Sequence, residues 1–86
     1  MEKQELDKLI EMVSTYVIYK AHDYKEAERE YTRLKEYAIK INITLNDWEM
    51  LKVFIERCIE LRKEELEAMY KRYELERDLV KYLLTK

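Results

Sequence analysis

The sequence predicts an all-α protein: a long antiparallel helical hairpin that dimerises into a four-helix bundle. Three observations lead to this fold class. The 86 residues include neither Gly nor Pro, the residues that most strongly interrupt helices. Apolar residues make up 48% of the chain and charged residues 42%. Over most of the length the apolar residues recur every three or four positions, which is the spacing of a helix that packs against another helix.

The first predicted helix covers about residues 3–41. Its apolar positions alternate four-residue and three-residue steps, with Lys20 as the one polar interruption: Leu6, Ile10, Val13, Val17, Tyr24, Ala27, Tyr31, Leu34, Ala38 and Ile41. We expect this helix to be unbroken, because a single polar residue in such a seam is common in continuous coiled coils. The alternative is a three-helix bundle with a bend near residue 22, because Asp23 followed by Glu26 also has the pattern of a helix N-cap.

The predicted turn covers about residues 42–46, where β-branched residues and two Asn interrupt the good helix formers. In a chain without Gly, Asn42 is the natural residue to take the left-handed conformation that ends a helix. Asn46 with Glu49 forms a capping-box pattern, and Thr44 with Asp47 offers the same device two residues earlier.

The second predicted helix covers about residues 47–84. Its seam is less regular and contains two charged residues: Ile55, Ile59, Arg62, Leu66, Met69, Tyr73, Glu76, Val80 and Leu83. Arg62 and Glu76 either face another helix and set its register, or mark places where the seam opens to solvent.

Apolar residues beside both seams make the apolar surface wider than one helix of a hairpin can cover. Burial of a Leu- or Phe-sized side chain is worth ~1.5–3 kcal/mol, so exposing many of them would exceed the stability margin of a small domain. We therefore expect a homodimer. The interface candidates are the flanking residues Leu9, Met12, Tyr16, Tyr19, Phe54, Leu61, Leu75 and Tyr82.

The composition excludes several classes of enzyme. Phosphate-binding loops, dinucleotide fingerprints and nucleophile elbows all need Gly. His22 and Cys58 are the only His and Cys, and neither belongs to a metal-ligand or nucleophile motif. We interpret His22 as a surface residue near the bend and Cys58 as a core thiol. The sequence thus predicts a non-enzymatic protein with no cofactor and no bound metal.

The leading functional hypothesis is a small regulatory protein that acts by binding another protein, such as an inhibitor encoded by a phage or other mobile element. The net charge of −2, the absence of an N-terminal signal pattern and the single Cys predict a cytoplasmic protein without membrane association. The alternative is a helical dimer that binds a nucleotide or RNA in a groove between subunits. The residues that would hold that ligand are Arg29, Arg33, Tyr37, Tyr70, Lys71 and Arg72.

Overall fold

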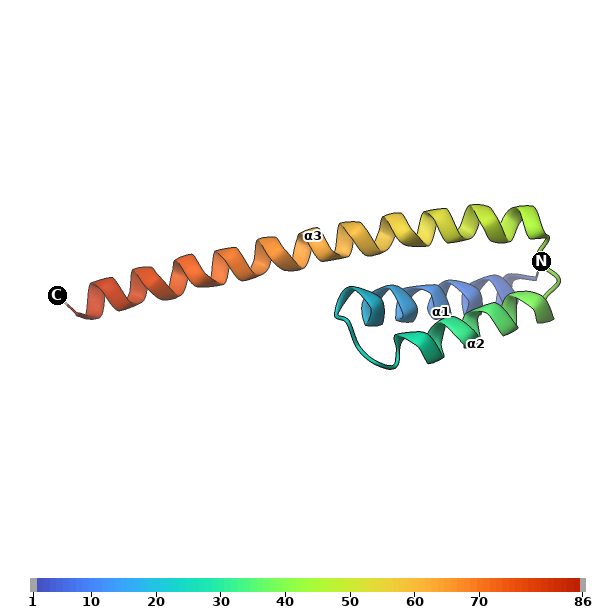
Figure 1. Ribbon diagram of the computed structural model, residues 1–86, viewed down its shortest axis with the longest axis horizontal. Coiled ribbons are helices and arrows are strands. Elements are labelled where there is room, and N and C mark those ends of the chain that lie inside the picture. Colours follow the sequence, from blue (N-terminus) through green and yellow to red (C-terminus); the bar gives the residue numbers. More distant parts are fainter. Residues whose placement is uncertain (1, 86) are drawn as a thin grey trace.

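The computed structural model describes residues 2–85, which fold into three helices. The first, α1, spans Lys3–Ala21, α2 spans Ala27–Lys40, and α3 spans Leu45–Leu84. Figure 1 shows α2 folded back antiparallel to α1, and α3 running in the direction of α1 and continuing far beyond both. The chain measures 64 × 21 × 21 Å. The predicted all-α class is confirmed.

The expectation of one unbroken helix over residues 3–41 is wrong, because α1 ends at Ala21 and α2 begins at Ala27. Asp23 has a φ of 55°, in the left-handed region. The Asp23 N–H donates to the Lys20 carbonyl at 3.2 Å, and the Tyr24 N–H donates to the Tyr19 carbonyl at 2.9 Å. These two bonds form a Schellman motif, which ends a helix and satisfies its last carbonyls. The bend lies where the three-helix alternative placed it, but Asp23 ends α1 rather than capping α2.

The break is stabilised by the core that it permits. Folding α2 back along α1 brings Leu9, Leu34 and Ile55 from three different helices into one cluster. Leu34 is fully buried, and the small side chains Ala21, Ala27 and Ala38 are also buried. An unbroken helix would carry Leu34 away from Leu9, and the chain would lose this core. Tertiary packing therefore overrides the local preference for a continuous helix.

A second Schellman motif ends α2 at the corner before α3. Asn42 has a φ of 61°, as predicted from the absence of Gly. The Ile43 N–H donates to the Ala38 carbonyl at 3.1 Å, and the Asn42 N–H donates to the Ile39 carbonyl at 3.1 Å. The N-cap of α3 is Thr44, whose hydroxyl accepts from the Asp47 N–H at 3.1 Å. The helix thus uses the earlier of the two capping patterns and begins at Leu45.

The two halves of α3 lie in different surroundings. We call α1, α2 and residues 45–62 of α3 the head, and residues 63–84 of α3 the arm. In the head, Ile55 is buried and Trp48, Leu51 and Ile59 pack against the core. In the arm only Leu66 is half-buried, and every other residue is exposed. Since α1 and α2 together cover only the first half of α3, the arm projects as a single helix (Figure 1).

Candidate functional site

An apolar groove runs between α1 and α3 along one side of the head. Its volume is about 390 Å³. The α1 wall includes Leu6, Ile10, Val13 and Val17, and the α3 wall includes Leu51, Phe54, Cys58 and Arg62. Leu6, Ile10 and Phe54 are exposed there. A groove between two parallel helices that is lined almost entirely by apolar side chains is a surface onto which another helix can pack.

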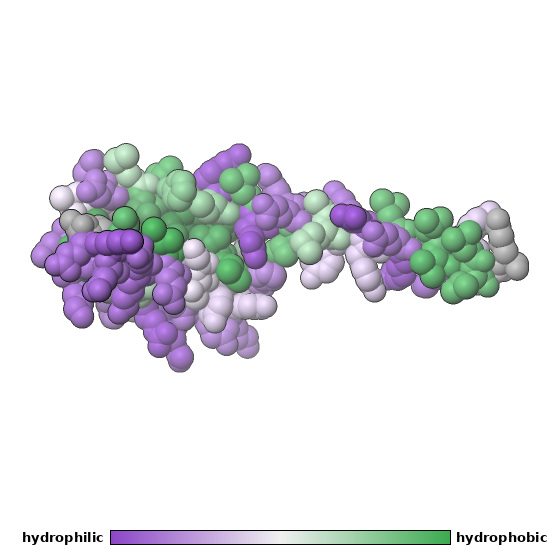
Figure 2. Space-filling model, turned by 180° about the vertical axis from the view of Figure 1, so that it is seen from behind, coloured by the Kyte–Doolittle hydropathy of each residue, from purple (hydrophilic) through white to green (hydrophobic). Residues whose placement is uncertain are grey.

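The arm continues the apolar surface of the head without covering it. Met69, Tyr73, Val80 and Leu83 lie on the predicted seam and are all exposed. Figure 2 shows hydrophobic residues gathered towards the end of the arm and in a band across the head. Beside Leu66, the side chains of Met69, Tyr70 and Tyr73 border a shallow hollow of about 370 Å³. Isolated exposed apolar residues are ordinary, so a group of them along one side of a helix is a candidate interaction surface.

The structure divides the eight interface candidates between the interior and the surface. Leu9 lies in the core and is only 7% exposed, and it also borders the floor of the groove, so its place at an interface stays a prediction. Met12 and Tyr16 pack against that core, and Tyr19 is half-buried with its ring 5.5 Å from the ring of Tyr24. The candidates from α3 are all exposed: Phe54, Leu61, Leu75 and Tyr82. The α1 candidates belong to the head because α2 folds back over them.

The six alternative ligand-binding residues fall on two separate elements. Arg29, Arg33 and Tyr37 belong to α2, whereas Tyr70, Lys71 and Arg72 belong to the arm. Several are already engaged: the Lys8 ammonium lies 4.9 Å from the centre of the Tyr37 ring, and Arg72 Nε lies 3.3 Å from Glu76 Oε1. Within one chain these residues do not line a common groove.

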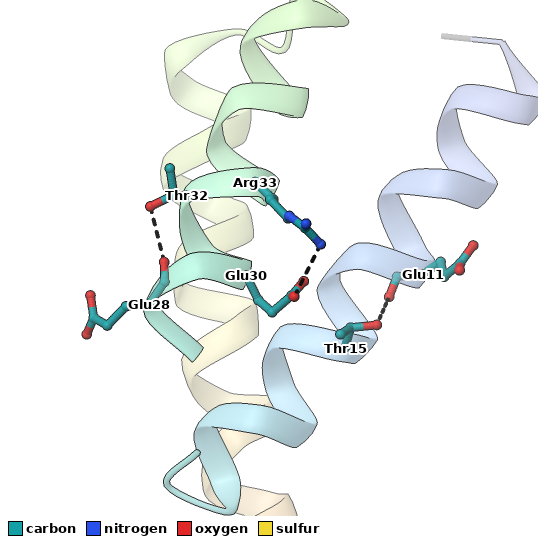
Figure 3. A network of polar contacts seen from close by, with 6 residues as sticks. All are labelled: Glu11, Thr15, Glu28, Glu30, Thr32 and Arg33. Carbon is teal, nitrogen blue, oxygen red and sulfur yellow. Dashed lines mark hydrogen bonds and ion pairs between the residues drawn. The ribbon is translucent and has the colours of Figure 1, made fainter. Parts of the chain in front are cut away.

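The polar contacts of α1 and α2 are local ones that support the helices. Figure 3 shows Thr15 and Thr32 donating to the carbonyls of Glu11 and Glu28, at 3.0 and 3.1 Å. It also shows the ion pair between Arg33 Nη1 and Glu30 Oε1, at 3.5 Å on the side of α2 towards α1. Each bond joins residues three or four apart in one helix, which is the usual pattern of solvated helix surfaces. None of them forms a site.

Aromatic rings form a cluster where α1, α2 and α3 meet. The Tyr31 ring centre lies 5.4 Å from that of Tyr16 and 6.2 Å from that of Trp48. Burial raises the pKa of the Tyr16 phenol above its ordinary value of 10.0, and the charges of Tyr31 and Glu28 raise it further. At neutral pH the Tyr16 ring is therefore an uncharged packing group.

The two candidate nucleophiles or ligands lie apart from one another. Cys58 is half-buried on the wall of the groove, more exposed than the core thiol that the sequence predicts. His22 is exposed at the bend, and its ring stacks on that of Tyr24 with centres 5.3 Å apart. Among residues 2–85 no three His, Cys, Asp or Glu side chains gather in a way that could hold a metal ion.

Sequence reasoning missed that Leu6 and Ile10 line an open groove, because it assigned them to a seam covered by the partner helix of a hairpin. The signal was present in the width of the apolar stripe on residues 6–18. That stripe includes the buried Leu9 on one side and the exposed Ile10 and Ile18 on the other. A stripe this wide needs two neighbours, and the chain supplies α2 and α3 for only part of it.

None of the helices within the described part of the chain is both long and apolar enough to cross a membrane.

Comparison of the chain with models of known protein families, with curated proteins and with solved structures finds no significant match. The groove and the arm therefore supply the functional argument.

Proposed function

We propose that this protein is a non-enzymatic binding module that docks a helix of another polypeptide along its arm and groove. The observation that carries this proposal is the series of exposed apolar residues that extends, between charged ones, from the groove to the end of the arm. Phe54 and Cys58 lie on the groove wall four residues apart. Met69 and Val80 follow on the same side of the helix at steps of eleven residues, about three turns, and Leu83 comes three residues later. That spacing is how one helix presents apolar side chains to another.

The head and the arm have separate roles in this function. The head fixes the first half of α3 through the Leu9, Leu34 and Ile55 core. The arm then extends from a rigid base, so a partner meets a helix that is already formed. Pre-formation lowers the entropic cost of binding compared with a segment that folds on contact.

A regulatory role agrees with this division, because a binding module regulates its partner by covering a surface of that partner or by displacing another protein from it. That such a regulator is encoded by a phage or another mobile element stays a prediction from the sequence. So does its cytoplasmic location.

Site-specific photo-cross-linking in the native cells tests the proposal. A photoreactive phenylalanine derivative replaces Tyr73 on the apolar side of the arm, or, as the matched control, the neighbouring Glu74 on its polar side. We expect the position-73 variant to form a discrete protein adduct and the position-74 variant to form far less. An adduct of twice the chain mass identifies a second copy, and any other mass identifies a different protein.

Both kinds of adduct support docking along the arm. Absence of an adduct from position 73, or equal adducts from the two positions, would contradict the proposed function.

A further inference from the structure

The charged residues within the apolar line of α3 indicate what covers it. From the groove wall, the line runs from Phe54 through Cys58 to Arg62. Continued beyond the end of α1 in steps of three and four residues, it passes Glu65, Met69, Arg72, Glu76, Val80 and Leu83. The charges therefore alternate in the order positive, negative, positive, negative, with Met69 at their centre.

We infer that the occupant is a second copy of this chain, paired antiparallel with Met69 at the two-fold axis. This inference rests on the proposed function and names its partner. The two-fold rotation places Arg62 at the level of Glu76 of the second copy, and Glu65 within one residue of the level of Arg72 of the second copy, each pair occurring twice. An in-register parallel pairing would instead place each charge beside its own copy, where like charges repel.

The same register covers the groove with apolar residues. It sets Val80 of the second copy at the level of Cys58, and Leu83 of the second copy at the level of Phe54. The end of each arm then lies between α1 and α3 of the other chain, running opposite to both. Each head thereby gains a fourth helix, which completes an antiparallel four-helix bundle. A parallel pair would leave both grooves open.

The exposed area is sufficient for a stable dimer. Six apolar residues on this surface are each between 52 and 66% exposed: Ile10, Phe54, Met69, Tyr73, Val80 and Leu83. Residues of this size expose on the order of 100 Å² each in that state. Together with the alkyl parts of the four charged side chains, they approach the roughly 800 Å² per partner that stable interfaces bury.

The proposed dimer pairs charged residues that cannot meet within one chain. Arg62 and Glu76 are separated by about 21 Å along α3, so they cannot meet within one molecule. Within the chain, Glu76 pairs with Arg72 at 3.3 Å. In the dimer Arg62 of the second copy joins this pair beside apolar groove walls, where an ion pair is less screened than in open water.

Charge reversal with mixing tests the inference by sedimentation equilibrium. The parent protein should have twice the chain mass of 10.7 kDa at micromolar concentration. Arg62→Glu alone and Glu76→Arg alone should each weaken the dimer on the order of a hundredfold, since each creates two like-charge pairs. An equimolar mixture of the two variants should restore the dimer as a heterodimer. In it the acidic positions 62 and 76 of one variant lie opposite the basic positions 76 and 62 of the other. The single chain with both reversals should also dimerise.

Arg57→Glu is the matched control. It makes the same charge change on the same helix, but Arg57 pairs with Glu60 away from this line and should leave the dimer unchanged. Far-UV circular dichroism checks that each variant is helical, and the doubly reversed chain gives a second measurement if one single variant fails to fold.

A parent protein that stays monomeric up to about 1 mM overturns the inference, and so does a mixture that fails to restore the dimer. Neither result touches the proposed function, which the cross-linking at position 73 decides separately by showing an adduct with another protein.

Discussion

Leu34 is the residue on which the head depends most. It is the one large side chain among those described that is fully buried, and it shares the core with Leu9 of α1 and Ile55 of α3. Leu34→Ala should lower the free energy of unfolding by about 2–5 kcal/mol, a large share of what a domain of this size has. Urea unfolding of both proteins at one fixed concentration measures this difference in the free energy of unfolding. Ile39→Ala, which truncates a 68% exposed residue of the same helix, should change the free energy of unfolding by less than about 0.5 kcal/mol.

The phenol of Tyr16 makes the stability of the head fall as the pH rises into the alkaline range. Burial raises its pKa in the folded state above 10.0, the ordinary value that applies to the unfolded chain. As the pH rises past that value, the unfolded state loses the phenol proton before the folded state does, so stability falls until the folded pKa is passed. Below pH 10 the contribution is fully present. Tyr16→Phe should therefore lose less stability than the parent between pH 9 and pH 11 in thermal unfolding.

At the scale of single elements, the sequence offers two N-capping patterns for α3, Thr44 with Asp47 and Asn46 with Glu49, and the structure shows which one is used. The Thr44 hydroxyl accepts from the Asp47 N–H, whereas the Asn46 side chain lies inside the first turn. Thr44→Ala should therefore cost about 1 kcal/mol of stability, and Asn46→Ala should cost a few tenths. The comparison is made by thermal unfolding of both variants. Equal losses, or a larger loss from Asn46→Ala, would place the cap at residue 46 instead.

The same scale shows how far sequence reasoning reaches. Asn42 could be assigned its left-handed conformation because it is the best available residue in a chain without Gly, and the structure confirms it. Asp23 takes the same conformation, but its pattern with Glu26 reads equally as the start of a helix. Local chemistry therefore marks residue 23 as a possible break and leaves the choice to packing. That choice depends on contacts between Leu9, Leu34 and Ile55, residues far apart in the sequence.

For the candidate site, the seam of α3 could be predicted from its spacing, and so could the exposure of Phe54 and Leu75. The groove could not, because its walls come from α1 and α3 and exist only when α2 folds back. Without α2 folded over them Leu9 and Tyr16 are surface residues, which is why the sequence pattern alone predicts both of them at an interface. The prediction of excess apolar surface is independent of this error, since the arm exposes such a surface in either arrangement.

For the whole molecule, the length of α3 relative to the head determines how long an antiparallel dimer would be. The chain is 64 Å long, and the arm accounts for about half of α3 at 1.5 Å per residue. An antiparallel dimer centred on Met69 places the start of each α3 about 36 Å from the axis, giving a particle about 72 Å long. One α3 of 40 residues spans about 60 Å, so doubling the mass lengthens the particle by only about a fifth.

Small-angle X-ray scattering can measure this dimension at concentrations where the protein is dimeric. Pairing of the arms alone, with their seams from Leu66 to Leu83 aligned end to end and both grooves left open, would move the axis towards residue 75 and lengthen the particle to about 90 Å. We expect the shorter value, because only the register that brings each arm into the other chain's groove covers Phe54 and Ile10 while pairing Arg62 with Glu76. A maximum dimension near 90 Å would show that the arms pair without reaching the grooves.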